Sequence, residues 1–169
     1  MNQEQVIDNE GTRTGLYFGF TSGVITTLGL IVGLHSGTHS LTAVVGGIVL
    51  IAIADAASDA TGIHLSKEAD PGASLRTVWL ATFATFFSKF VISMTFLPPV
   101  LLLPLNTAIL VAILWGLVII ITLSFFIARN QQTPALPVII EHCVITLAVI
   151  AISHYVGVWI NQTFGQVAL

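Results

Sequence analysis

Long apolar segments alternate with short polar ones along nearly the whole chain. A helix needs about 20 mostly apolar residues to cross the hydrocarbon core of a bilayer, and five segments are long enough. They cover residues 15–35, 41–65, 77–97, 105–128 and 137–160. Runs of this length are typical of helices, since the strands of membrane barrels are shorter and alternate in polarity. The pattern therefore predicts one all-α integral membrane domain over residues 1–169, with five transmembrane helices.

The basic residues predict how these helices are oriented. Arg13 precedes the first span, Lys67 and Arg76 lie between the second and third, and Arg129 lies between the fourth and fifth. The loops on the other side and the C-terminal tail contain no Lys or Arg. Because Lys and Arg are enriched in cytoplasmic loops, we expect the N-terminus inside and the C-terminus outside. A prokaryotic plasma membrane is the expected location.

Composition narrows the function. Of the 169 residues, 55% are hydrophobic and only 8% are charged, whereas about a quarter of the residues of a soluble domain are charged. Five Lys and Arg residues in all are too few for a nucleic-acid partner. Cys143 is the only cysteine, which excludes an intrachain disulfide and a cysteine metal cluster. The sequence has no serine-nucleophile motif and no cofactor fingerprint, so we expect neither an enzyme nor a bound cofactor.

Four charged residues lie inside the predicted spans: Asp55, Asp59, Lys89 and Glu141. Each costs at least about 2.5–3.5 kcal/mol at a helix centre and needs a partner, a cavity or a proton. A helical rise of about 1.5 Å per residue places Asp55 and Lys89 about 16 and 18 Å from the cytoplasmic end. Asp59, Glu141 and Ser22 fall at about 6–10 Å. We therefore expect an Asp55–Lys89 pair near the midplane and a second, shallower polar layer.

Helical spacing predicts a polar pathway around these residues. Asp55 and Asp59 are one turn apart and share a helix face. The first and third spans each carry small polar side chains at spacings of three and four, which form one polar stripe on each helix. We expect these stripes to line a transport pathway, at Ser22, Thr26, Thr85 and Lys89. Two interpretations of the Asp55–Lys89 pair stay open, a transport role and a structural clip. Asp59 has no lysine of its own in this interpretation and is the stronger functional candidate.

Two further patterns occur on the first span. Gly15, Gly19 and Gly23 are spaced four apart and make a surface that another helix can approach closely. We expect this surface to be the interface of a homodimer, and ordinary packing between membrane helices is the alternative. His35 and His39 are also four apart, near the outer end of the span. This spacing can bind a metal, although two histidines near a membrane interface are more often simply solvated.

Four segments resemble the vacuolar iron transporter family of five-helix divalent-metal transporters. Residues 19–30, GFTSGVITTLGL, resemble the family's first-helix motif, in which an Asp-Gly pair is followed by an apolar, threonine-containing run. Residues 57–66, ASDATGIHLS, resemble its second-helix motif. Residues 97–99, Leu-Pro-Pro, resemble the end of its third helix, and residues 153–157, SHYVG, resemble the close of its fifth. The resemblance covers nearly the whole chain in the same order.

The resemblance implies a homodimer that moves ferrous iron or manganese out of the cytosol in exchange for protons, along a pathway between the subunits. The chain departs from the family at functional positions. Ser22 stands where the family has its helix-1 aspartate, and Asp59 stands where it has a methionine. Lys89 has no counterpart, and the glutamate-rich cytoplasmic segment of some members is absent. Losing the methionine favours harder, oxygen-preferring ions.

These considerations give three hypotheses. The first is a divalent-metal exporter that binds Fe²⁺ or Mn²⁺ through Asp55, Asp59 and Glu141 and exchanges it for protons. The second is a proton-linked transporter of a non-metal solute, in which Asp55 and Lys89 form a gate. The third is a membrane protein that keeps the fold without transporting anything.

Overall fold

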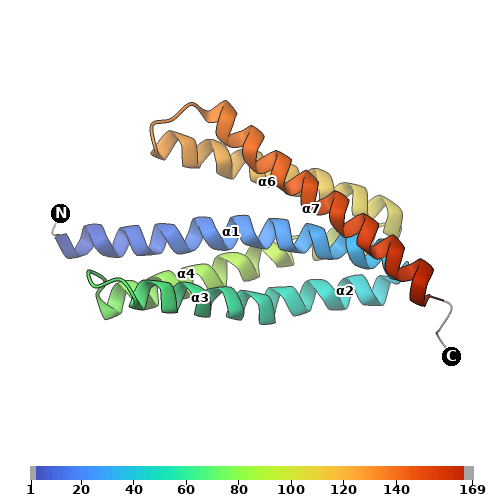
Figure 1. The fold of residues 1–169 in the computed structure, drawn as a ribbon, viewed down its shortest axis with the longest axis horizontal. Helices are drawn as coiled ribbons and strands as arrows, with labels where there is room; N and C mark the ends of the chain where they lie inside the picture. The colour runs from blue at the N-terminus through green and yellow to red at the C-terminus, as the bar shows by residue number, and fades with distance from the viewer. Residues whose placement is uncertain (1–2, 166–169) are drawn as a thin grey trace.

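The structure is a computed structural model that describes the backbone of residues 3–165 and the side chains of residues 10–165. Throughout the described range the chain is helical, without a strand (Figure 1). The elements in order are α1 (Gln3–Thr38), α2 (Leu41–Leu50), η1 (Ile51–Asp55), α3 (Ala56–Glu68), α4 (Leu75–Met94), α5 (Leu97–Leu102), α6 (Leu105–Asn130) and α7 (Ala135–Phe164).

These elements make five helices that are long and apolar enough to cross a membrane, which confirms the number of spans. They are Glu10–Thr38, Leu41–Glu68, Leu75–Leu102, Leu105–Asn130 and Ala135–Phe164. The second combines α2, η1 and α3, and the third combines α4 with the short α5. Large apolar side chains such as Leu50, Phe87 and Val118 are exposed on the outside of the bundle. An apolar exterior of this kind is expected of an integral membrane protein.

Capping residues explain where several of these helices begin. Ser40 and Ser74 precede α2 and α4, and their hydroxyls accept hydrogen bonds from the backbone N–H groups of Ala43 and Thr77. A serine at this position satisfies a donor that the first helical turn leaves free. Proline occupies the first turn of α5, where its missing N–H costs nothing. The predicted proline-rich break after the third span therefore contains one short helix of its own.

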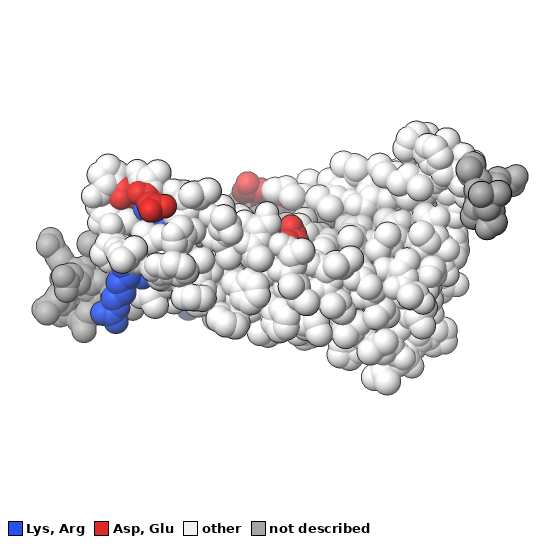
Figure 2. Space-filling view, turned by 90° about the horizontal axis from the view of Figure 1, so that it is seen from below, with Lys and Arg blue, Asp and Glu red and all other residues white. Residues whose placement is uncertain are grey.

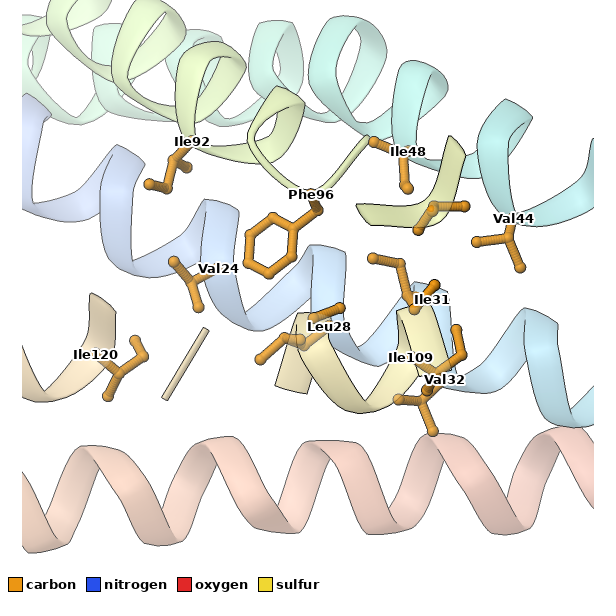
Figure 3. Packing of buried hydrophobic residues seen from close by; sticks show 13 residues of the cluster. Val24, Leu28, Ile31, Val32, Val44, Ile48, Ile92, Phe96, Ile109 and Ile120 are labelled. Carbon is orange, nitrogen blue, oxygen red and sulfur yellow. The ribbon is translucent and has the colours of Figure 1, made fainter. Parts of the chain in front are cut away.

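α1 lies at the centre of the bundle, with α4 and α3 on one side and α6 and α7 on the other (Figure 1). Its N-terminal half packs mainly on α4. Its C-terminal half contributes to an apolar core in which Phe96 points towards Val24 and Leu28 (Figure 3). Ile48 and Val44 of α2 belong to the same core. The long α1 thus joins two different environments, a glycine-rich contact with α4 and an apolar core.

The charged residues are distributed unevenly along the bundle. Arg13, Lys67, Arg76 and Arg129 belong to the end that holds the N-terminus, the α3–α4 turn and the α6–α7 turn (Figure 1). On the face in Figure 2, Lys and Arg side chains lie only at this end, whereas acidic side chains also reach the surface about halfway along the molecule. That acidic surface has to be explained if the middle of the bundle lies in lipid.

Candidate functional site

The candidate site is centred on Lys89 of α4, whose side chain is fully buried. Its Nζ lies 2.5 Å from Asp55 Oδ2, 2.5 Å from Asp59 Oδ2 and 3.0 Å from Ser22 Oγ. Three elements therefore supply three oxygens to one ammonium group: η1, α3 and α1. A buried ammonium is tolerated only where opposite charge and hydrogen bonds replace its hydration, and this arrangement provides both.

Asp59 holds the cluster together by accepting two hydrogen bonds. Its Oδ2 accepts from Lys89 Nζ at 2.5 Å and from Ser22 Oγ at 2.6 Å. Asp55 differs, because its contact with Lys89 is close enough for an ion pair but Asp55 Oδ2 has no partner of hydrogen-bond geometry among the described residues. The short distance still makes this an ion pair, since an ion pair has weaker angular requirements than a hydrogen bond. Asp55 is then the carboxylate that is held less firmly.

This geometry confirms the predicted contact between Asp55 and Lys89 and corrects two other expectations. Asp59 does not lack a lysine, because the same ammonium contacts both carboxylates. Nor do the polar residues form two layers, since Ser22 and Asp59 meet Lys89 directly. A depth along the helix axis locates the Cα of Lys89, whereas its long side chain carries the charge well away from that Cα.

A π-helical turn lies at Asp55. η1 spans Ile51–Asp55, and the N–H of Ala56 donates to the carbonyl of Ile51, five residues earlier. Such a turn holds one extra residue, so the helix faces before and after it are rotated relative to a regular helix, and turns of this kind are frequent at functional sites. The sequence gives little signal for it, because IAIAD contains neither proline nor glycine.

Three glycines allow α1 to lie close to α4 beside this cluster. A Cβ at Gly19 would clash with Ser88 Oγ and lie 2.6 Å from the carbonyl oxygen of Thr85. A Cβ at Gly15 or Gly23 would also overlap atoms of α4. The close helix contact that the glycines predict is therefore present, but its partner is α4 of the same chain. The expectation that this face forms the dimer interface is wrong, because the face is already covered.

Thr26 and Thr85, the other predicted pathway residues, use their hydroxyls within their own helices. Thr26 Oγ1 donates to the carbonyl of Ser22 at 2.8 Å, and Thr85 Oγ1 donates to that of Ala81 at 2.8 Å. This back-bonding leaves neither hydroxyl as a donor for the Lys89 cluster. A polar contact that the predicted pathway did not include joins the fully buried Thr27 and Ser93 at 3.0 Å. The polar track between α1 and α4 therefore continues past Lys89.

Glu141, the third predicted metal ligand, does not join the cluster. It is exposed on α7, a helix that packs on α1 and α6, and no ion pair or hydrogen bond involves it among the described residues. Anywhere in the described part of the chain, no three His, Cys, Asp or Glu side chains are grouped so that they could hold a metal ion. The predicted ligand set of Asp55, Asp59 and Glu141 is therefore not assembled within one chain.

The charges of the cluster do not balance if all three ionisable groups are ionised. Two carboxylates and one ammonium carry a net charge of minus one, which is costly in the middle of a membrane helix. The side chains of Asp55 and Asp59 are 38% and 22% exposed, whereas Lys89 is inaccessible. A proton or a cation that balances the charge therefore has to arrive from the carboxylate side.

Comparison with known proteins gives no match of any kind: no family model, no curated protein and no solved structure matches the chain. The family resemblance of the sequence accordingly stays a prediction, and the function has to be argued from the Lys89 cluster itself.

Proposed function

We propose that this chain is a membrane transporter that carries divalent metal ions, Mn²⁺ or Fe²⁺, out of the cytosol in exchange for protons. The observation that carries the proposal is the convergence of Asp55 Oδ2, Asp59 Oδ2 and Ser22 Oγ on a single point, where Lys89 Nζ now lies. Carboxylate and hydroxyl oxygens suit hard divalent cations. A cation that takes the place of the ammonium would find these three oxygens already gathered.

Lys89 acts in this proposal as an exchangeable counter-charge. In the metal-free state, one protonated carboxylate, one carboxylate anion and one ammonium give a neutral cluster. When a divalent cation binds, two carboxylate anions, the cation and a neutral lysine also give a neutral cluster. Binding thus releases two protons, one from a carboxyl group and one from Lys89. Because net charge is costly within the membrane, we expect an exchange of two protons for each divalent ion.

The resemblance to vacuolar iron transporters supports the same proposal from the sequence. Ser22 occupies the place of the family's helix-1 aspartate, and its hydroxyl donates to the carboxylate of Asp59. The two side chains are thus direct neighbours. A carboxylate moved from the first helix to the second would keep its charge at nearly the same point, which explains how a family member could function with both positions changed.

The buried ammonium also favours a second candidate function. Lys89 is fully buried between two carboxylates, and a fixed positive charge repels a divalent cation. A proton-linked transporter of a non-metal solute would use the Asp55–Lys89 contact as a gate that opens when Asp55 is protonated. In this alternative Lys89 never leaves the cluster and no metal binds there.

We further propose that the protein is a homodimer with its N-terminus in the cytosol. The position of the basic residues at one end of the bundle supports the orientation. Since α4 covers the glycine face of α1, a second copy would have to use another surface. The surface of α2, η1 and α3 is the better candidate, because the carboxylate of Asp55 is partly exposed there and a second copy would shield it from lipid.

The proposal is tested with purified protein in liposomes that contain a pH indicator. An inward Mn²⁺ gradient should drive Mn²⁺ uptake and proton efflux in a ratio of one to two. Asp59→Asn should abolish both fluxes, while Glu141→Gln, an acidic residue outside the cluster, should leave both unchanged. Proton movement without Mn²⁺ dependence would favour the second candidate. Neither flux in well-folded protein would favour a chain that keeps the fold without transport.

A further inference from the structure

Three histidines line one hollow at the opposite end of the molecule from the Lys and Arg residues. His35 lies in the last turn of α1, His39 follows that helix directly, and His154 belongs to α7. The hollow has a volume of about 450 Å³, and Ile109 and Ile113 of α6 form part of its wall. Since a water molecule takes about 30 Å³ in the liquid, an ion with several waters fits there. Among the described residues, none that lines the hollow is acidic.

His35 and His39 are already as close as two ligands of one ion. Their ring centres are 5.4 Å apart, and the N–H of His39 donates to the carbonyl of His35 at 3.0 Å. Two imidazoles on a tetrahedral ion, with metal–nitrogen bonds of about 2.0–2.1 Å, have ring centres roughly 5 Å apart. The rings thus already lie near the separation that chelation requires.

His35 also has a free ring nitrogen. Its Nδ1 is buried and has no hydrogen-bond partner among the described residues. A buried nitrogen of this kind has lost its hydration without gaining a replacement, and such groups in a folded protein call for an explanation. A metal ion beside His39 would give this nitrogen its missing partner.

The backbone of His39 is a second unusual feature. Its φ is 53°, in the left-handed region where a residue that follows a helix is usually glycine or asparagine. Histidine pays a conformational cost there that glycine would not. Glycine would therefore suit this backbone at least as well, although histidine is among the non-glycine residues that occur there most often.

His154 also lines the hollow, but its Nδ1 is not free to bind a metal ion. Its Nδ1 is 2.7 Å from Ser36 Oγ and is engaged in a hydrogen bond. Within the described residues, no group of three metal-binding side chains is arranged to hold an ion. The arrangement therefore offers two protein ligands, and water would complete the coordination.

We propose that His35 and His39 form a binding site for a divalent transition-metal ion that prefers imidazole, such as Ni²⁺, Cu²⁺ or Zn²⁺. The expected order of affinity rises from Mn²⁺ to Ni²⁺ and Cu²⁺, and imidazole ligands suit Ni²⁺, Cu²⁺ and Zn²⁺ better than the oxygens around Lys89 do. The site does not depend on transport, and it exists whether or not an ion passes Asp55 and Asp59.

Calorimetric titration of the tag-free full chain in detergent with Ni²⁺ tests this site. We expect a Ni²⁺ site whose affinity is at least tenfold weaker in His35→Gln. His39→Gly should bind equally poorly, yet it should be at least as heat-stable as the native chain without metal, because glycine suits the left-handed backbone. His64→Gln should bind normally, since His64 lies at the other end, in contact with Thr82. His154→Gln should also keep the site.

Three results would overturn the proposal. One is unchanged Ni²⁺ affinity in both His35→Gln and His39→Gly. Another is a loss of stability in metal-free His39→Gly, which would mean that the histidine serves the helix end. The third comes from paramagnetic resonance of the Cu²⁺ complex, where coordination by one imidazole nitrogen instead of two would exclude the pair.

Discussion

Lys89 and Glu141 are both charged residues within membrane-length helices, but they lie in opposite surroundings. Lys89 is fully buried on α4 and contacts three oxygens from three other elements. Glu141 is exposed on α7 and takes part in no ion pair or hydrogen bond among the described residues. The charge of Lys89 is therefore stabilised by contacts inside the bundle, whereas the charge of Glu141 can be stabilised only by what surrounds the bundle. Removing each charge should have very different effects.

The largest effect is expected for Lys89→Met. Removing one partner of a buried charge cluster leaves the others uncompensated, which typically lowers the free energy of unfolding by about 3–5 kcal/mol. Adding Asp55→Asn to the same chain should restore much of this loss. Chemical denaturation of the detergent-solubilised single and double variants measures both terms. If the two losses simply add, Asp55 and Lys89 are not coupled, and the contact between them does not hold the bundle together.

Gly19→Leu should have the next largest effect, because it tests the packing that brings Lys89 to α1. A side chain at Gly19 overlaps Ser88 and the backbone of Thr85, and overpacking of a close contact typically costs about 1–3 kcal/mol. Gly62→Leu is the matched control, since a Cβ at Gly62 meets nothing within 4 Å. Thermal unfolding compares the two variants. Equal stability would mean that α1 and α4 are not in close contact.

Glu141→Gln should have the smallest effect. Substitutions of surface residues outside a network usually change stability by no more than about 0.5 kcal/mol, and Mn²⁺ transport should continue at the native rate. Transport assays and unfolding of the same preparation measure both properties. A clear loss of transport in stable protein would show that Glu141 meets the pathway in a way that a single chain does not provide, for example from a second subunit.

The sequence was sufficient to predict the parts of the fold that follow from long apolar segments and from the spacing of small residues along a helix. Five apolar segments predicted five helices, and the glycines of α1 predicted a close helix contact. The partner of that contact could not be predicted, because a surface of small residues fits a helix of the same chain as well as one of another subunit. The prediction that Glu141 joins Asp55 and Asp59 failed for a similar reason. The position of a residue along a span gives its depth, but not the direction in which its side chain points.

The residues of the site could be predicted from the sequence more fully than the contacts between them. Asp55, Asp59, Ser22 and Lys89 all followed from polar residues in apolar spans, and the Asp55–Lys89 contact followed from their similar depth. The sharing of one ammonium by two carboxylates did not. It depends on the reach of the lysine side chain and on the π-helical turn at Asp55, and neither has a clear signal in the residue pattern.

The central claim is that a divalent ion and the Lys89 ammonium compete for the same oxygens, and Mn²⁺-dependent thermal stabilisation tests it most directly. A bound ligand stabilises the folded state, and the stabilisation grows with the logarithm of its concentration relative to its dissociation constant. Lys89→Met removes the competitor, so at equal Mn²⁺ its melting temperature should rise more than that of the native chain. Adding Asp59→Asn should abolish the rise. If Mn²⁺ stabilises the native chain but not Lys89→Met, or stabilises neither, the ammonium does not occupy a metal site and the account is wrong.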